Sequence, residues 1–571
     1  MPDRLGLRRS VATDIFLLLA MCFALYYWHL GLLPFYTRGE SREALVVWEM
    51  VRTGDWILPR VNGDYIPFKP PLFHWTGAIL ATLTHRVDEF TVRLPSAIFA
   101  TCGVLMIYFA GARLWNKNAG LVSAVVLATT TEWWNSATIA QVDLILAFFV
   151  TAGLLYFYRT YRQGRASVAN AAILGVLLAC ATLAKGPVGI AVPGFVIFVF
   201  LLLRRDLRFF KPGHLAAAAT VFILIAGSWY FAAWRQGGSG FLQRQILEEN
   251  FGTASGVSGH YQPSIYYFAV YVLNFLPWSF FTPAIAWFLF RYRRSLSDRH
   301  LLFPVVWFVS VLVFFTISQG KRGVYILPLY PAAALLLGAW VAELETKRQP
   351  GQFLATATTY VIAITAGLAA LTALMTFLGP LKTRITPFLR LAAYLRPLAP
   401  IAPSSWVAIG IFGLSALVVC VFLTHKRWQP VFLALGVLTA ASAVFVETAY
   451  YPVFAAQRTL KPFMERVTQR VGPDAPLFFY DLFDFGAVFY SRRHIPIYDR
   501  AEPVKRVYLL MREEDWKRLN AVRSLERLDI SEGGGPTGRH KVVLAERYVT
   551  SSEKSLPVST GGPSDAELRA D

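Results

Sequence analysis

A set of charged residues stands at one end of long apolar runs in this sequence, where charge is costly and therefore points to function. Carboxylates there can activate a hydroxyl or phosphate group as general bases, and cations can hold a phosphate group. Together these residue types fit group transfer from a lipid phosphate. The set comprises Glu40, Arg42, Glu43, Lys69, Asp143, Lys185, Glu249, His260, Lys321 and Arg322.

Several of these residues also have a plainer interpretation. Glu40 and Glu43 could form the solvated face of a surface helix, and for Glu43 alone this interpretation is favoured. Asp143 could cap the helix that it begins, or balance its dipole. Lys185 could be a loop lysine that extends to the membrane surface. His260 has the environment of an ordinary surface histidine.

Elements that would position these residues are long apolar helices. The chain has 571 residues, of which 55% are hydrophobic and 15% aromatic, with a mean hydropathy of +0.46. Apolar runs of about 20 residues, each sufficient to cross a bilayer as a helix, recur from Asp14 to Tyr450. The sequence therefore predicts an α-helical polytopic membrane protein. About thirteen spans are expected, near residues 14–34, 92–112, 119–135, 140–158, 168–183, 187–203, 214–234, 265–290, 301–318, 324–343, 353–378, 404–424 and 429–449.

Positive charge gathers in alternate loops, which sets the expected orientation. The clusters are Arg113/Lys117, Arg159/Arg162/Arg165, Arg204/Arg205/Arg208/Lys211, Arg291/Arg293/Arg294/Arg299, Lys347/Arg348 and Lys426/Arg427. All lie on the side of the N-terminus, which is therefore expected to be cytoplasmic. An odd number of spans then places the C-terminus outside. Lys185 and the pair Lys321-Arg322 fall in outer loops, against this pattern, which favours a phosphate-binding role for them.

The net positive charge and the cysteines say less about function than the charged set does. The formal charge is +20 and the pI is 9.8, but the basic residues lie in short loops and not in a nucleic-acid-binding motif. Nucleic acid is therefore not an expected partner. The four cysteines lie in predicted spans, where they are expected to serve as packing residues. They are Cys22, Cys102, Cys180 and Cys420.

Two regions outside the spans are expected to be structured. The first outer loop, residues 35–91, contains an amphipathic helix over 40–51 that is expected to lie on the membrane interface. Gly54 ends that helix, Asn62-Gly63 forms a tight turn, and Lys69-Pro70-Pro71 is extended before a second short amphipathic helix.

After Tyr450 the pattern changes to a small α/β domain. Strands are predicted over 477–480, 495–498, 507–511 and 542–545, with helices over 484–490 and 512–520. The expected organisation is a transmembrane domain (1–450), an outer α/β domain (451–549) and a disordered tail (550–571).

The same charged residues carry a family resemblance. The ordered combination resembles bacterial GT-C glycosyltransferases, most of all the branch of the lipid A aminoarabinose transferases and more distantly the protein O-mannosyltransferases. The matching stretches are 36–44, 54–63, 69–75, 93–96, 141–143, 184–189, 249–252, 276–278, 318–322 and 325–331. They span nearly all of residues 10–345, and only the general architecture matches beyond that.

This resemblance implies a GT-C fold and an inverting transferase with an undecaprenyl-phosphate sugar donor. Glu40 and Asp143 match the two acidic positions of the family's cavity, Glu40 as catalytic acid/base or acceptor-binding carboxylate. The basic positions expected to bind the donor phosphate match Arg42, Lys69, Lys185, Lys321 and Arg322. Residues expected to line the substrate cavity are Glu43, Glu249, His260 and Tyr325.

Two departures weaken parts of the analogy. Gly39 precedes Glu40 where paired acids are common, and Phe68 precedes Lys69 where the aminoarabinose transferases usually have an acid. The second departure puts a metal ligand, and aminoarabinose as the sugar, in doubt, so a divalent ion stays open.

The expected partners are the lipid-linked sugar and a lipid or glycan acceptor such as lipid A, with the chain acting as a monomer in the bacterial inner membrane and the cavity facing the periplasm. The alternatives are a flippase for lipid-linked sugars, which would need repeat symmetry and charges at the bilayer midplane, and a non-catalytic envelope partner.

Overall fold

The computed structural model describes residues 10–63, 65–252, 262–346, 428–498, 506–521, 525–535, 538 and 540–548. His260, Cys420, the predicted spans 353–378 and 404–424, and the tail 550–571 lie outside the described residues.

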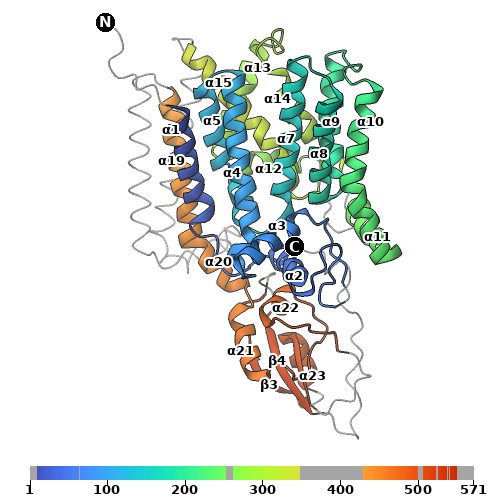
Figure 1. Cartoon of the computed structure of the whole chain (residues 1–571). Helices are drawn as coiled ribbons and strands as arrows, with labels where there is room; N and C mark the ends of the chain where they lie inside the picture. Colours follow the sequence, from blue (N-terminus) through green and yellow to red (C-terminus); the bar gives the residue numbers. More distant parts are fainter. Residues whose placement is uncertain are drawn as a thin grey trace.

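A bundle of apolar helices forms the larger part of the molecule (Figure 1). By length and composition, six helical segments of the described chain are apolar enough to cross a membrane, or seven if a bent pair counts as one. The prediction of a polytopic helical membrane protein is confirmed, and the number thirteen stays a prediction. The main helices are α1 (Val11–Cys22), α4 (Glu89–Leu114), α5 (Lys117–Thr129), α7 (Val142–Arg162), α8 (Val168–Lys185), α9 (Val188–Leu203), α10 (Pro212–Phe222), α11 (Ser228–Phe241), α14 (Leu302–Ile317), α15 (Tyr330–Thr346) and α19 (Trp428–Phe445).

Close helix contacts in the bundle depend on small residues. Gly111 of α4 and Gly120 of α5 face each other, and a Cβ at Gly120 would collide with the carbonyl oxygen of Tyr108. Small residues allow helix backbones to approach where lipid supplies no hydrophobic drive for association. The tight α4–α5 pair supports α4, whose second turn begins with Arg93.

One predicted span is broken. Residues 265–290 form α12 (Tyr266–Asn274), a short 3₁₀ turn η4 (Trp278–Phe281) and α13 (Thr282–Arg291), and the two helical parts are bent by 110°. Pro277 lies at the break, where it can neither donate a backbone hydrogen bond nor continue the helix. The apolar run alone could not reveal this bend.

The predicted loop helix over 40–51 is present as α2 (Arg38–Thr53), which begins two residues earlier and ends at Gly54 as expected. The Thr37 hydroxyl accepts from the Glu40 backbone N–H at 3.1 Å, and Gly54 ends the helix with φ of 72°. Helix α2 is buried on most of its surface between α3 (Leu72–Thr84), the bundle and α22 (Phe485–Ser491), and its place at the membrane interface stays a prediction. The favoured surface role of Glu43 is wrong, since its side chain is buried.

A C-terminal sheet region, defined here as the described residues from α20 (Tyr451–Arg458) to β4 (Val542–Tyr548), extends beyond one end of the bundle (Figure 1). Its sheet has the order β1-β2-β4-β3: β1 (Leu477–Phe479) is parallel to β2 (Arg506–Arg512), while β4 is antiparallel to both β2 and β3 (Glu526–Ile530). Helices α21 (Lys461–Val471), α22 and α23 (Glu513–Asn520) accompany it.

One strand prediction for this region is wrong, and one strand was missed. Residues 495–498 contribute a single bridge, Ile497 to Phe479, and not a strand. Strand β3 was not predicted, because its sequence Glu-Arg-Leu-Asp-Ile is dominated by charge. The other predicted strands and the helices near 484–490 and 512–520 are present, whereas the domain boundaries stay predictions.

The sheet region is attached to the first loop through polar contacts. The Asn62 side chain donates to the Ile495 carbonyl and accepts from the Ile495 N–H, both at 2.9 Å. His494 contacts Glu49 of α2 at 2.7 Å. Tyr490 accepts from the Phe35 N–H at 2.8 Å. The sheet region therefore contacts both α2 and the segment that precedes it.

Candidate active site

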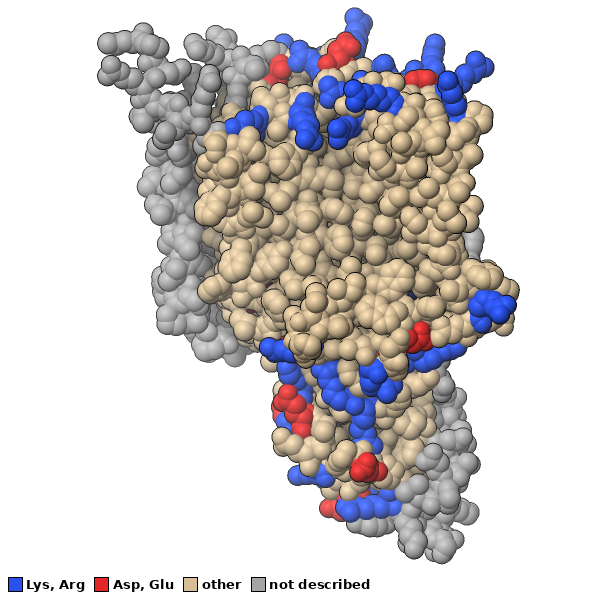
Figure 2. Space-filling model, in the orientation of Figure 1, with Lys and Arg blue, Asp and Glu red and all other residues tan. Residues whose placement is uncertain are grey.

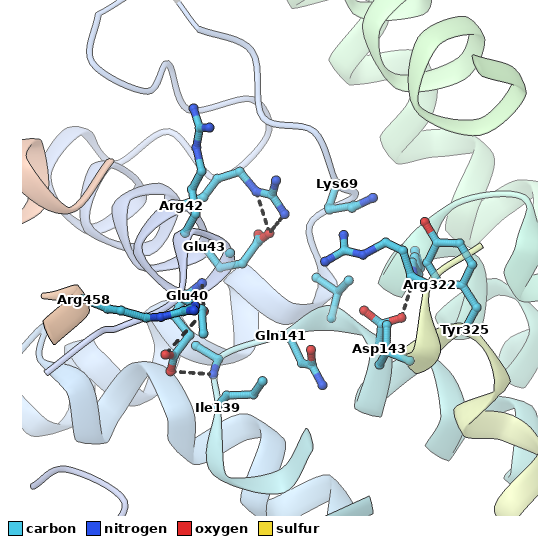
Figure 3. A pocket seen from close by; sticks show the side chains of 17 residues that line it. Glu40, Arg42, Glu43, Lys69, Ile139, Gln141, Asp143, Arg322, Tyr325 and Arg458 are labelled. Carbon is cyan, nitrogen blue, oxygen red and sulfur yellow. Dashed lines mark hydrogen bonds and ion pairs between the residues drawn. The ribbon is translucent and has the colours of Figure 1, made fainter. Parts of the chain in front are cut away.

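A cavity of about 540 Å³ lies at the end of the bundle that faces the C-terminal sheet region. It is built by the first turn of α2, the loop before α3, the segment entering α7, the end of α8, the 3₁₀ turn η5 (Gly323–Leu329) and the end of α20 (Figure 3). Its lining residues are Thr37, Arg38, Gly39, Glu40, Arg42, Glu43, Lys69, Ile139, Ala140, Gln141, Val142, Asp143, Lys185, Arg322, Val324, Tyr325 and Arg458.

Most residues selected from the sequence meet in this cavity, although they come from distant segments. Those that line it are Glu40, Arg42, Glu43, Lys69, Asp143, Lys185, Arg322 and Tyr325. Lys321 does not line it: its side chain is buried and donates to the Gln262 carbonyl at 3.1 Å. Glu249 belongs to the helical segment η3 (Leu242–Gly252), but its side chain, like all of His260, lies outside the described residues.

Positive charge predominates in the cavity. Six basic side chains line it against three carboxylates. Arg38 and Arg458 were not selected from the sequence: Arg38 adjoins the Gly39-Glu40 stretch, while Arg458 lies in the region where no site signal was visible. An excess of cations in a partly enclosed cavity attracts an anionic ligand.

Glu40 is held from behind by Arg93. The Arg93 guanidinium contacts the Glu40 carboxylate at 2.7 Å and also donates to the main-chain carbonyls of Leu30 and Leu33, at 3.0 and 2.7 Å. The Ala140 N–H is a further donor to the same Glu40 oxygen, at 3.3 Å. Both charged side chains are almost fully buried. Arg93 was missed as a site residue, although an arginine inside a predicted span is itself a signal.

Glu43 positions Arg42. It contacts Arg42 at 3.0 Å through one carboxylate oxygen and His74 at 2.6 Å through the other. Burial alone would raise the pKa of Glu43, but Arg42, His74 and Lys69 outweigh it and lower that pKa to about 2. Glu43 is therefore ionised and fixes the Arg42 guanidinium at the cavity wall. His74 is a second residue that the sequence did not single out.

The opposite wall carries the pair Asp143 and Lys185. Asp143 lies in the first turn of α7, and Lys185 ends α8 just before Gly186, whose φ of 87° favours glycine. Their side chains form an ion pair, and the Lys185 ammonium lies 4.3 Å from the centre of the Tyr325 ring. All three residues line the cavity, so this pair is accessible to a ligand.

Lys69 and Arg322 lie between the two walls (Figure 3). Desolvation first, and then the charges of Lys185 and Arg42, lower the pKa of Lys69 well below its usual value. Crowded cations of this kind are stabilised when a phosphate enters among them.

In the described part of the chain, no group of three or more His, Cys, Asp and Glu side chains could hold a metal ion. Phe68, which stands at the position where related transferases have an acid, instead lies between two guanidinium groups, with Arg42 and Arg244 at 5.2 and 4.2 Å from its ring centre.

Comparison with known proteins identifies the family. Residues 68–231 match the model of the dolichyl-phosphate-mannose-protein mannosyltransferase family. An uncharacterized protein of Aquifex aeolicus (strain VF5) is 30% identical over 334 residues, which cover 58% of this chain and 74% of that protein. The chain belongs to this GT-C glycosyltransferase family.

A named transferase and a solved structure extend the comparison. The undecaprenyl phosphate-alpha-4-amino-4-deoxy-L-arabinose arabinosyl transferase of Aeromonas salmonicida (strain A449) is 27% identical over 321 residues, covering 54% of this chain and 57% of that enzyme. The chain thus spans little more than half the length of that transferase.

The crystal structure of ArnT from Cupriavidus metallidurans bound to undecaprenyl phosphate has a TM-score of 0.74 at 21% identity, covering 94% of this chain and 98% of that one. At this identity the likeness establishes the fold of a membrane glycosyltransferase with several apolar spans and a small C-terminal mixed sheet.

Proposed function

We propose that this enzyme transfers a sugar from a polyprenyl-phosphate donor, of the undecaprenyl-phosphate type, to an acceptor on the outer face of the bacterial inner membrane. The observation that carries the proposal is the cavity, in which six cations and three carboxylates meet at one end of the apolar helices. The arabinosyl transferases and ArnT, whose names and titles include undecaprenyl phosphate, support the choice of donor.

In this proposal the donor phosphate lies among Lys69, Lys185 and Arg322, with Arg42 completing the group. Glu43 keeps Arg42 oriented through its contact at 3.0 Å. The cationic side chains of this cluster stabilise the phosphate most strongly when the glycosidic bond breaks, because negative charge then grows on the leaving group.

Glu40 is the proposed base. One of its oxygens is occupied by Arg93 and the Ala140 N–H, while the other accepts from the Thr37 hydroxyl at 3.4 Å. That second oxygen would accept the proton of the acceptor as the acceptor oxygen attacks the anomeric carbon. The bond between the anomeric carbon and the phosphate oxygen breaks, and polyprenyl phosphate leaves. A single displacement inverts the configuration of the sugar carbon.

The positive loops support a cytoplasmic N-terminus, and in this proposal the cavity and the sheet region face the periplasm. An acceptor in that compartment, such as lipid A or another envelope glycan, would reach the cavity from the side of the sheet region, where Arg38 and Arg458 lie. The complete protein is proposed to carry the thirteen spans expected from its sequence.

The test is label transfer by the purified protein in lipid vesicles. Wild type and Glu40→Gln would be incubated with radiolabelled undecaprenyl-phosphate sugars and an envelope lipid extract. Label that moves into a new product with wild type alone supports a transferase in which Glu40 is the base. Equal transfer by both proteins would refute the role of Glu40. Donor binding by both without any product, combined with donor movement across the vesicle membrane, would identify a flippase instead.

A further inference from the structure

A second cavity lies at the opposite end of the bundle from the candidate active site. It measures about 630 Å³ and opens between α4, α7 and α8. Lysine and arginine side chains gather at this end of the molecule, as Figure 2 shows. The lining residues are Met106, Phe109, Ala110, Arg113, Leu114, Ala152, Leu155, Tyr156, Tyr158, Arg159, Arg162, Gln163 and Leu177. We call this cavity the α4–α7 groove.

Three arginines line the α4–α7 groove, and no carboxylate does. Among the residues that the structure describes, Arg113, Arg159 and Arg162 form no ion pair; Arg113 lies 5.8 Å from the centre of the Phe109 ring, and Arg162 contacts a ring nitrogen of His300 at 3.2 Å. Arg299, at the same end of the bundle, is by contrast paired with Glu343 at 2.9 Å. The groove thus holds a local positive charge that the described protein does not neutralise.

The remaining lining side chains make the groove amphiphilic. Most are apolar or aromatic, from Met106 and Phe109 on α4 to Leu155 on α7 and Leu177 on α8. The arginines lie in the last turns of α4 and α7, so the charge is at the end of the groove and the apolar walls extend along the helices. This arrangement matches a ligand with an anionic head and a hydrocarbon chain.

A plainer interpretation explains the arginines but not the groove. Basic residues in the last turn balance the helix dipole and fix the orientation of spans. Those effects require no cavity between the helices. Basic pockets between transmembrane helices at the cytoplasmic surface, however, bind the head groups of anionic lipids.

We propose that the α4–α7 groove binds an anionic phospholipid of the surrounding membrane. Arg113, Arg159 and Arg162 hold its phosphate, and one acyl chain lies against α4 and α8. The inference goes beyond the transfer reaction, since the groove shares no lining residue with the active-site cavity. A phospholipid is favoured over the polyprenyl donor because the cations proposed to hold the donor lie at the other end of the bundle.

The experiment compares lipid retention by the purified full chain, using native mass spectrometry and phosphatidylglycerol, phosphatidylcholine or undecaprenyl phosphate. The test variant is Arg113→Gln/Arg159→Gln, and the control is Arg208→Gln, an exposed arginine that does not line the groove. Two lost charge-assisted contacts should lower phosphatidylglycerol retention about tenfold or more, with the control unchanged. Equal retention by all three proteins, or equal retention of phosphatidylcholine, would overturn the proposal.

A photoactivatable phosphatidylglycerol locates the lipid independently of any loss of folding. Crosslinks in wild type should fall on residues 106–114 and 152–163, and should be displaced by unlabelled phosphatidylglycerol. Displacement by undecaprenyl phosphate at lower concentration would overturn the choice of a phospholipid. Sugar transfer by the double variant in phosphatidylcholine vesicles should equal that of wild type, which separates this site from the active site.

Discussion

The two walls of the active-site cavity hold their carboxylates in different ways. On the α2 wall, Glu40 is paired with Arg93, which does not line the cavity and is tied to main-chain carbonyls behind it. On the opposite wall, Asp143 is paired with Lys185, which lines the cavity and lies over Tyr325. On the α2 wall only Glu40 of the pair borders the cavity, and we call this the closed wall; on the opposite wall both partners border it, and we call this the open wall.

This difference assigns different work to the two acids. A buried ion pair held by further hydrogen bonds keeps its geometry, and removal of one partner leaves a costly uncompensated charge. Such a pair suits a carboxylate that must orient an acceptor in the same way in every cycle. An accessible pair can exchange partners when a phosphate arrives, so the pair of Asp143 with Lys185 suits the binding and release of the donor.

The largest effect is expected from Arg93→Met. This variant leaves the buried Glu40 carboxylate without its cation and should destabilise the protein by about 3–5 kcal/mol, with loss of transfer. Thermal unfolding of the purified protein, together with label transfer, measures both consequences. The corresponding change on the open wall, Lys185→Met, should lower stability less, because the side chains of that pair are 12% and 11% exposed, against 2% and 1% for Arg93 and Glu40.

The double variant Arg93→Met/Glu40→Gln is the matched control. It removes both charges, so most of the lost stability should return while transfer stays absent. If the double variant were as unstable as Arg93→Met, the hydrogen bonds of Arg93 to Leu30 and Leu33, and not its pairing with Glu40, would explain the effect.

Asp143→Asn tests whether Lys185, on the open wall, exchanges Asp143 for the donor phosphate when the donor binds. Without the carboxylate, Lys185 no longer has to leave a partner, so undecaprenyl phosphate should bind about tenfold more tightly, equivalent to roughly 1.4 kcal/mol. Turnover should fall, because the product is released more slowly. Equilibrium binding of undecaprenyl phosphate and single-turnover transfer separate the two effects. Weaker binding by Asp143→Asn would mean that Asp143 holds Lys185 in its binding position.

The cations between the walls predict a pH dependence. Desolvation, Lys185 and Arg42 lower the pKa of Lys69, so its ammonium loses the proton at lower pH than an ordinary lysine does. A bound phosphate favours the charged form, and donor binding should therefore take up a proton. Affinity for undecaprenyl phosphate should then weaken as pH rises through the lowered pKa of Lys69.

Lys69→Arg provides the comparison, because an arginine stays protonated throughout this range. Its binding curve should lose the part of the pH dependence that comes from Lys69. Binding measurements over a pH series, with both proteins in the same lipid, check this. A pH profile unchanged by Lys69→Arg would assign the dependence to the phosphate of the lipid itself.

The sequence predicted the helices and loops that build the site better than it predicted the contacts between their side chains. Thr37 and Gly54 set the ends of α2 locally, and Lys185 stood out because it breaks the distribution of loop charge. Arg93 reaches the site through its tertiary contact with Glu40. Arg458 lines the cavity from the end of α20, the helix that begins the sheet region. No local pattern encodes such contacts.

Lys321 and Arg322 show the same limit at neighbouring positions. Both carry the charge that breaks the loop pattern, yet only Arg322 lines the cavity, while Lys321 is directed to the Gln262 carbonyl. Strand β3 was missed because its charged sequence lacks an apolar strand pattern, and it is identified by its pairing with β4. The backbone path after a span, and not the residue type, decides which side chain reaches the cavity.

The smallest effect is expected where the sheet region supports the closed wall. His494→Ala removes the contact with Glu49 of α2, at 2.7 Å, but leaves Arg52 paired with the same carboxylate, also at 2.7 Å. Helix α2 should therefore stay folded while the placement of Glu40 becomes less exact, so transfer should fall by about two- to fivefold, roughly 0.4–1 kcal/mol. His540→Ala is the control, because the His540 side chain contacts the exposed Glu514 at 3.3 Å and not α2. If both variants lost the same activity, the loss would reflect the sheet region as a whole; if neither did, the closed wall would owe its geometry to Arg93 alone.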